Sequence, residues 1–109
     1  MGEEMDRKRV IVTGASSGIG RATAKLFLEA SAVVTIVGRR RTPLAELARQ
    51  CATADGQVHI IVADLSDEKQ CEVCIAEAVE RMGGLDVLVN AAGILKSGNM
   101  EATSLELWD

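Results

Sequence analysis

The sequence predicts an α/β fold, a doubly wound parallel sheet that is incomplete, with about four strands and flanking helices. Three observations predict it. Short apolar runs alternate along the chain with segments of helical spacing. The runs are apolar on both faces and do not alternate with polar residues, as is usual for strands of a parallel sheet that helices cover on both sides. A glycine-rich turn follows the first run, at the end of a strand where such sheets bind ligands.

The elements are expected in the order strand, helix, strand, helix, strand, helix, strand. The four apolar runs predict strands at 10–13, 33–37, 58–63 and 85–89. The first helix is predicted by an apolar face that consists of Ile19, Ala22, Thr23, Leu26, Phe27 and Ala30.

The second and third helices carry start and stop signals. Thr42 is expected to be the N-cap of the second helix, with Pro43 at its first position. Ser66 is expected to cap the third helix, which should end at Gly83.

The end of the chain carries a further start signal. Thr103 and Glu106 form a capping box, which predicts that a helix begins there. Because only 107–109 follow, and isolated helices below about 12 residues are marginal, we expect an interrupted chain. The alternative is a short C-terminal turn that docks on the sheet. In an incomplete sheet the fourth strand would be an exposed edge, through which the chain could associate with another chain.

Length and composition exclude several classes of protein. A chain of 109 residues forms at most one domain, with residues 1–8 expected to be a flexible segment. The net charge of −4 argues against nucleic acid or an anionic membrane as the partner. No apolar run approaches the about 20 residues of a membrane helix, and the N-terminus has no signal-peptide core. A cytoplasmic location is expected, with an organelle matrix as the open alternative.

The three cysteines are expected to be core thiols and not a metal site. The spacing of Cys71 and Cys74 resembles a metal or redox motif, but both lie on an apolar helical stripe. A zinc ion needs about four ligands, and the chain has one histidine. An odd cysteine count without a signal peptide also does not indicate a disulfide framework, so Cys51 is expected in the core too.

The glycine-rich turn predicts a dinucleotide site. Gly14, Gly18 and Gly20 lie between an apolar strand and an amphipathic helix, where glycines allow a tight turn and close approach of a diphosphate. The helix that follows directs free N–H groups and the positive end of its dipole toward that diphosphate.

The end of the second strand favours NADP over NAD. Many dinucleotide folds place an acid about 20 residues after the glycines, which binds the ribose 2′-hydroxyl. This chain has Arg39 and Arg40 there, and a guanidinium can pair with a 2′-phosphate. A solvated basic turn is the alternative.

Two further strand ends carry polar residues. Asp64 either accepts a hydrogen bond from the adenine amino group or is an acid that precedes a helix. The segment Asn90–Gly93 either allows close approach of the cofactor or is a simple exit from the strand.

Together these motifs resemble the short-chain dehydrogenase/reductase (SDR) family from residue 9 to residue 109, in the order of the family. They are the glycine-rich segment 13–20, Asp64 and Leu65, the segment 90–93, and 103–109. The resemblance implies a Rossmann-type fold, NAD(P) as cofactor, and hydride transfer between NADP(H) and an alcohol or carbonyl. The cofactor-binding residues that it implies are Gly14, Ser16, Ser17, Gly18, Ile19, Gly20, Arg39, Arg40, Asp64, Leu65, Asn90, Ala91, Ala92 and Gly93.

The sequence departs from the family in three places. The usual second asparagine of the segment 90–93 is Ala91, and the usual glycine before the second strand is Ser31. The chain also contains no tyrosine, so the Tyr-x-x-x-Lys motif of the family is missing and no catalytic residue is predicted. We therefore expect 9–109 to be the N-terminal portion of an NAD(P)-binding domain that is inactive alone. The alternative is a non-catalytic NADP(H)-binding or interaction protein derived from the family. The substrate is not predicted.

Overall fold

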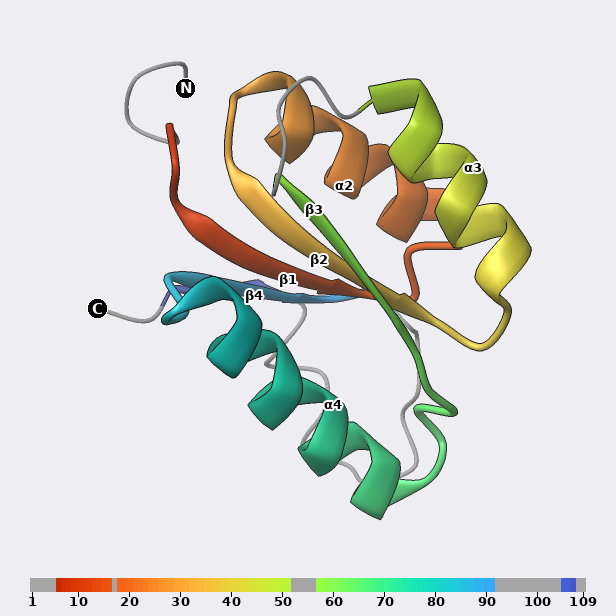
Figure 1. The fold of residues 1–109 in the computed structure, drawn as a ribbon. Coiled ribbons are helices and arrows are strands. Elements are labelled where there is room, and N and C mark those ends of the chain that lie inside the picture. The colour runs from red at the N-terminus through yellow and green to blue at the C-terminus, as the bar shows by residue number, and fades with distance from the viewer. Residues whose placement is uncertain (1–5, 17, 52–56, 92–104, 108–109) are drawn as a thin grey trace.

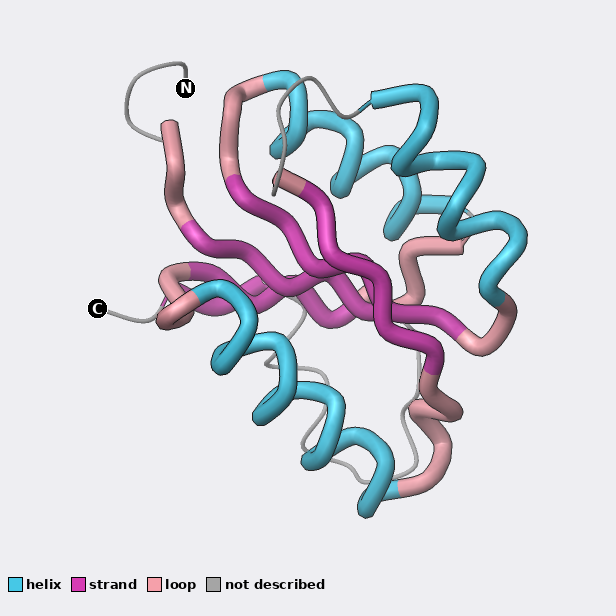
Figure 2. The backbone as a smooth tube through the Cα atoms, viewed as in Figure 1, coloured by secondary structure: helices cyan, strands magenta, loops and turns pink. Residues whose placement is uncertain are grey.

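The computed structural model describes residues 6–16, 18–51, 57–91 and, for the backbone, 105–107. Figures 1 and 2 show strands and helices that alternate along the chain. The elements are β1 Arg9–Thr13, α2 Gly18–Glu29, β2 Val33–Gly38, α3 Arg41–Cys51, β3 Val58–Val62, α4 Glu68–Met82, β4 Val87–Asn90 and β5 Leu105–Leu107.

The sheet has the order β3-β2-β1-β4-β5, which confirms the predicted doubly wound topology. Strands β1 to β4 are parallel, and Ile11 of β1 lies between Thr35 of β2 and Leu88 of β4. The chain winds outward from β1 through β2 to β3, and then returns to the other side of β1 with β4. This reversal of strand order beside β1 is the place where open α/β sheets bind ligands, outside the carboxyl ends of the strands.

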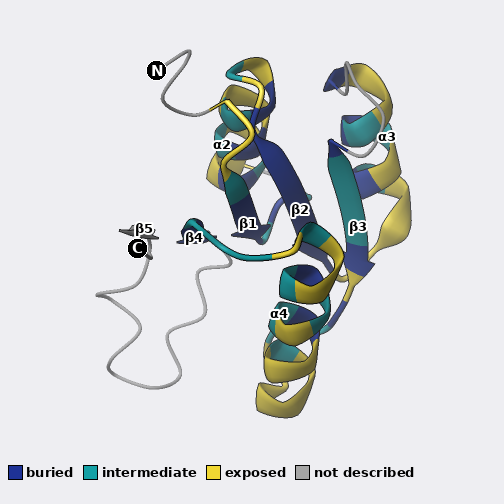
Figure 3. Cartoon of the chain, turned by 60° about the vertical axis from the view of Figure 1, so that its left-hand side comes forward, coloured by how far each residue is buried: buried dark blue, intermediate teal, exposed yellow. Residues whose placement is uncertain are grey.

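Helices cover both faces of the sheet, with α2 and α3 on one face and α4 on the other (Figure 1). Alternate residues of β1 therefore enter different cores, and β2 is buried along its whole length (Figure 3). The core under α2 and α3 includes Val10, Val12, Val34, Ile36, Leu28, Leu44 and Leu47. The core under α4 includes Ile11, Val37, Ile61, Cys74 and Ala78. This two-sided burial is the reason why the strands lack polar alternation.

The predicted start residues of two helices are wrong. Helix α3 begins at Arg41, so Thr42 lies inside its first turn and is not the N-cap. Helix α4 is capped by Asp67 and not by Ser66, because the Asp67 carboxylate accepts hydrogen bonds from the backbone N–H groups of Lys69 and Gln70 at 2.9 and 3.2 Å. A carboxylate is also favoured there by the helix dipole. The predicted end is confirmed, since Gly83 is left-handed with φ 81°.

The helix predicted near the end of the chain is also wrong. Leu105–Leu107 forms the strand β5, which pairs antiparallel with β4, while Thr103 and Ser104 lie outside the described residues. An unpaired edge of β4 would leave backbone N–H and C=O groups without partners, and β5 supplies them. Strand β4 is thus not an edge of the sheet that the described residues form, whose outer strands are β3 and β5. Association of the chain through an exposed sheet edge stays a prediction.

The thiols of Cys51 and Cys74 are buried, as predicted, whereas Cys71 is only half-buried. Burial raises the pKa of Cys74 to about 11, and its Sγ donates a hydrogen bond to the Cys71 carbonyl oxygen at 3.3 Å. Such a thiol is a poor nucleophile at neutral pH.

Within the described residues, no group of three His, Cys, Asp or Glu side chains is placed to hold a metal ion. The helices of this described part are all too short or too polar to cross a membrane.

Ser31 stands where the resemblance predicts glycine, and its backbone is left-handed, with a φ of 69°. It follows α2, and its N–H donates to Leu28 O at 3.0 Å. We expect Ser31→Gly to raise the free energy of unfolding by about 1 kcal/mol, because glycine has no Cβ that disfavours this conformation. Urea titration measures the change. Ser31→Ala keeps the Cβ and is the control, so equal stability of the glycine and alanine variants would contradict the argument.

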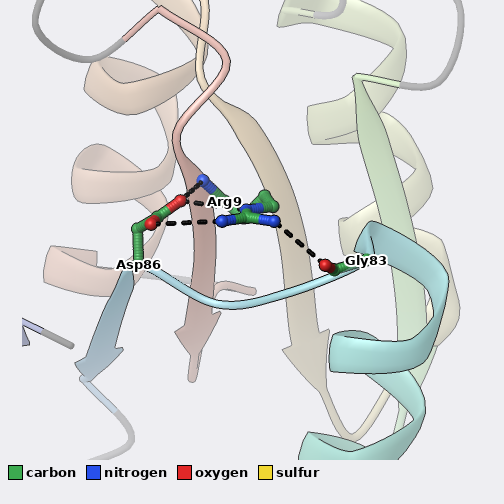
Figure 4. A network of polar contacts seen from close by, with 3 residues as sticks. All are labelled: Arg9, Gly83 and Asp86. Atoms are coloured by element: carbon green, nitrogen blue, oxygen red, sulfur yellow. Dashed lines mark hydrogen bonds and ion pairs between the residues drawn. The ribbon is translucent and has the colours of Figure 1, made fainter. Parts of the chain in front are cut away.

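A polar network joins the starts of β1 and β4 to the end of α4 (Figure 4). Asp86 Oδ2 accepts hydrogen bonds from the backbone N and the Nε of Arg9 at 2.8 and 3.0 Å. Arg9 Nη1 donates to Gly83 O at 2.9 Å, and a Cβ on Gly84 would lie only 2.3 Å from this Nη1. The network lies at the amino edge of the sheet, opposite to the predicted site.

This network predicts an acid-dependent part of the stability. Hydrogen bonds from Arg9 lower the pKa of Asp86 below its ordinary value of 3.8. A carboxylate whose pKa is lower in the folded state than in the unfolded state stabilises the folded state at any pH above its unfolded pKa. This stabilisation is lost as the pH falls through the pKa of the folded state. The difference in free energy of unfolding between wild type and Asp86→Asn should therefore be constant near neutral pH and shrink below about pH 4. Urea titrations across this range test it, and a difference independent of pH would contradict it.

Candidate functional site

The carboxyl ends of β1 to β4 are joined by three backbone hydrogen bonds that continue beyond the strands. The N–H of Ala15 donates to Val37 O at 3.0 Å, which links the turn after β1 to β2. The N–H of Ala63 donates to Gly38 O at 2.9 Å, and that of Ala91 donates to Thr13 O at 3.2 Å. The segments that carry the predicted site residues therefore leave the sheet side by side at one edge.

The glycine-rich turn needs its glycines for two different reasons. Gly14 and Gly18 have φ values of 69° and 61°, a backbone conformation that residues with a Cβ rarely adopt. Gly20 lies in the first turn of α2, where a Cβ would be 2.0 Å from the carbonyl oxygen of Gly14. The start of α2 is thus packed directly against the turn, and its N-terminal N–H groups lie beside the end of β1.

Ser16 and Ile19 lie between these glycines in the sequence. A Cβ on Gly38 would lie 3.4 Å from Ser16 Oγ, so Ser16 packs against the end of β2. Ile19 is 79% exposed, although it is a large apolar residue at the start of a helix. It offers apolar surface next to the helix N-terminus. Ser17 lies outside the described residues.

Arg39 and Arg40 follow the buried Gly38 and precede α3. Both are exposed, and the next residue, Arg41, is exposed as well. No acidic residue occurs in the short connection from β2 to α3. The carboxyl end of β2 therefore presents positive charge, which suits an anionic group such as a phosphate.

Asp64 and Leu65 come after β3 and are half-buried. The carboxylate Oδ1 of Asp64 accepts hydrogen bonds from Ser66 Oγ at 2.7 Å and from Ser66 N at 3.0 Å. The backbone N–H of Asp64 donates to Gln70 Oε1 at 2.7 Å. Asp64 is thus held by the turn that leads into α4, and it is not the cap of that helix.

Asn90 ends β4, and its side chain meets a residue that sequence reasoning did not single out. Thr13 Oγ1 donates to Asn90 Oδ1 at 2.9 Å, and this hydroxyl is also 3.4 Å from Val89 O. The contact fixes the Asn90 amide between β1 and β4, at the reversal of strand order. Ala91 is half-buried beside it, while Ala92 and Gly93 lie outside the described residues. The only sequence signal for Thr13 is its place directly before the first glycine.

The described residues of the predicted site all lie at the carboxyl edge, and their properties fit a dinucleotide. The turn gives close access to backbone N–H groups at a helix N-terminus, which is the usual site for a diphosphate. A positive segment lies at one neighbouring strand end and a carboxylate at the next. A Cβ on Gly20 would lie 2.0 Å from Gly14 O, so there is no room for a side chain between the turn and the helix.

Comparison with known proteins agrees with this geometry. A family model described as short chain dehydrogenase matches residues 8–109. An uncharacterized oxidoreductase of Staphylococcus haemolyticus is 32% identical over 106 residues, which are 97% of this chain and 45% of that protein.

Solved structures are similar as well. The glucose dehydrogenase of Caenorhabditis elegans has a TM-score of 0.75 and 36% identity, over 90% of this chain and 42% of its own. The 3-ketoacyl-(acyl-carrier-protein) reductase of Brucella melitensis, complexed with NADH, has a TM-score of 0.70 and 29% identity, over 78% of this chain and 34% of its own. The chain spans less than half the length of each of these three proteins.

Proposed function

The chain belongs to the short-chain dehydrogenase family, and we propose that it is the NADP(H)-binding portion of an oxidoreductase. The whole enzyme would transfer hydride between NADP(H) and an alcohol or carbonyl substrate. Residues 9–109 would supply the N-terminal portion of its Rossmann domain. The observation that carries the proposal is the packing of Gly20 against Gly14, since it brings a helix N-terminus to the end of β1.

Each strand end would bind a different part of the cofactor. The glycine-rich turn and the start of α2 would bind the diphosphate and the nearby ribose, through Gly14, Ser16, Ser17, Gly18, Ile19 and Gly20. Asp64 and Leu65 would contact the adenine. The segment 90–93 would pass along the cofactor, with Asn90 held in place by Thr13.

The preference for NADP over NAD rests on the end of β2. Arg39 and Arg40 are exposed there, in a connection without an acidic residue. A guanidinium can donate two hydrogen bonds to a phosphate, whereas the ribose hydroxyl of NAD offers no charge. The Brucella reductase is described as complexed with NADH, so the family accommodates that cofactor too.

We expect Arg39→Asp to weaken the binding of NADPH by roughly tenfold or more and that of NADH much less. The variant removes a donor to the 2′-phosphate and adds a carboxylate that repels it. Fluorescence titration of both reduced cofactors gives the two dissociation constants. Lys25→Asp, on an exposed position of α2, is the control for the change in net charge. Equal losses of NADPH and NADH binding would refute the assignment of Arg39.

The bound cofactor would supply the hydride donor or acceptor. Reduction of a carbonyl also needs a proton donor beside it, for which the family uses a tyrosine with a lysine nearby. The 109 residues contain no tyrosine. These residues would therefore bind and orient the cofactor without moving a proton to the substrate.

A non-catalytic NADP(H)-binding protein is the second candidate, and the missing tyrosine favours it for the 109 residues taken alone. The two candidates are separated by assaying NADPH consumption with a panel of carbonyl compounds. We expect binding without turnover from the 109-residue chain. Turnover by this chain would show that another group donates the proton, and the absence of cofactor binding would contradict both candidates.

A further inference from the structure

The carboxylate of Asp64 is oriented by the side chain of Ser66. Ser66 Oγ lies 2.7 Å from Asp64 Oδ1, and the Ser66 backbone N lies 3.0 Å from the same oxygen. Two donors on one oxygen restrict rotation about the last side-chain bond of an aspartate, which is otherwise broad. Ser66 is exposed, so this hydroxyl is not needed to fill a core.

The backbone around Asp64 is held in the same way. Its N–H donates to Gln70 Oε1 at 2.7 Å, and its carbonyl oxygen accepts from the N–H of Asp67 at 3.0 Å. Gln70 lies in the first turn of α4, whose start is fixed by the Asp67 cap. The position of Asp64 is therefore held by α4 and by the backbone, and the Ser66 hydroxyl, together with the Ser66 N–H, restrains the direction of its carboxylate. Because these contacts already hold the carboxylate in one orientation, less conformational entropy is lost when a ligand binds to it.

We propose that Ser66 is a positioning residue, which aims the Asp64 carboxylate at the 6-amino group of the adenine of the cofactor. The inference rests on the proposed function, in which Asp64 contacts adenine. A carboxylate is an acceptor only, so it favours the amino group of adenine and disfavours the carbonyl oxygen of a 6-oxo purine. Ser66 would thus contribute to the choice of base without touching the cofactor.

A purely structural role for Ser66 makes a different prediction. The Ser66 backbone N–H and the Asp67 cap would still close the turn if the hydroxyl were removed. A structural role would change stability, or the affinity for every dinucleotide alike. A positioning role changes the discrimination between two bases, which is the quantity to measure.

The test compares the binding of NADPH with that of reduced nicotinamide hypoxanthine dinucleotide phosphate, which has a 6-oxo group in place of the amino group. The wild-type chain, Asp64→Ala, Ser66→Ala and Ser66→Thr are titrated with both cofactors. We expect the wild type to favour NADPH and Asp64→Ala to lose most of this preference. Ser66→Ala should reduce the preference by roughly threefold or more. Ser66→Thr keeps the hydroxyl and should retain the preference.

The possible failures are distinguishable. If Asp64→Ala keeps the wild-type preference, or if the wild type has none, the contact of Asp64 with adenine in the proposed function is wrong, and the inference falls with it. If Asp64→Ala loses the preference while Ser66→Ala keeps it, only the role of Ser66 is refuted. If Ser66→Thr behaves as Ser66→Ala does, the hydroxyl is not the group responsible, and the inference is likewise refuted.

Discussion

Replacing Gly20 with alanine is expected to lower the free energy of unfolding by about 2 kcal/mol and to weaken NADPH binding by roughly tenfold or more. The added Cβ would lie 2.0 Å from Gly14 O and 2.7 Å from Gly14 C. Both atoms belong to the backbone of the glycine-rich turn, so no side chain can rotate to relieve the contact. Either α2 or the turn must move, and the diphosphate site lies between them.

The direction of this effect is informative because helix propensity predicts the opposite. Gly20 lies within α2, and alanine is more favourable than glycine in a helix by about 1 kcal/mol. A stability gain would therefore follow if the contact with Gly14 were loose. The steric cost of an overpacked backbone contact, about 1–3 kcal/mol or more, is expected to exceed this gain.

Gly18→Ala is the matched control. Gly18 is the first residue of α2, two positions before Gly20, but a Cβ there would have no atom within 4 Å, and only its left-handed φ of 61° opposes substitution. We expect this variant to lose about 1 kcal/mol of stability. Urea titration and NADPH fluorescence measure both variants. If Gly20→Ala is as stable as the wild type and binds NADPH equally well, the close packing of turn and helix does not form the site.

The sequence predicted the sheet well because burial on both faces leaves a strong signal. Strands β1 and β2 appear as mainly apolar runs without polar alternation, and their predicted and observed limits agree to within one residue. The left-handed Gly83 was predictable for a related reason, since few residues other than glycine adopt that conformation easily. Such features depend on local composition and need no knowledge of distant contacts.

One error occurred where a distant partner decides the local structure, and another where two neighbouring residues could each cap the same helix. The capping-box pattern at Thr103 and Glu106 is a signal for a helix, but Leu105–Leu107 pairs with β4 instead. The hydroxyl of Ser66 suits an N-cap equally well in isolation, but it bonds Asp64, and Asp67 caps α4. At the end of the chain the pairing with β4 selected a strand, whereas at the start of α4 the local hydrogen bonds of Asp67 selected the cap.

The site shows the same division. The order of strand ends, and therefore the place of Gly14, Arg39 and Asp64 at one edge, followed from the topology of a doubly wound sheet. The contact of Thr13 with Asn90 did not, because these residues are 77 positions apart and nothing near Thr13 indicates its partner. The sequence thus predicted which strand ends form the site, whereas the hydrogen bonds that hold their side chains in place could be seen only in the structure.

Gln57→Leu is expected to cause the other large loss, about 2–3 kcal/mol of the free energy of unfolding. Gln57 lies just before β3 and is only 5% exposed. Its Nε2 donates to Leu28 O and Ala32 O at 2.9 and 3.0 Å, so both amide hydrogens reach backbone carbonyls, one in the last turn of α2 and one just before β2. Leucine fills a similar volume but donates nothing. Leu28 O also accepts from Ser31 N–H, so most of the cost falls on Ala32 O, whose residue is fully buried.

Gln50→Leu separates this effect from a general effect of replacing a glutamine. Gln50 is exposed, and its Oε1 accepts from Arg21 at 3.1 Å on the surface between α2 and α3. Exposed substitutions of this kind usually change stability by less than about 0.5 kcal/mol. Urea titration measures the free energy of unfolding of both variants. The comparison holds if this free energy depends on the urea concentration with the same slope in both. Because Gln57 lies at the amino edge of the sheet, the folded Gln57→Leu variant should bind NADPH as the wild type does. A loss of less than about 1 kcal/mol would mean that water or a shifted backbone replaces the amide.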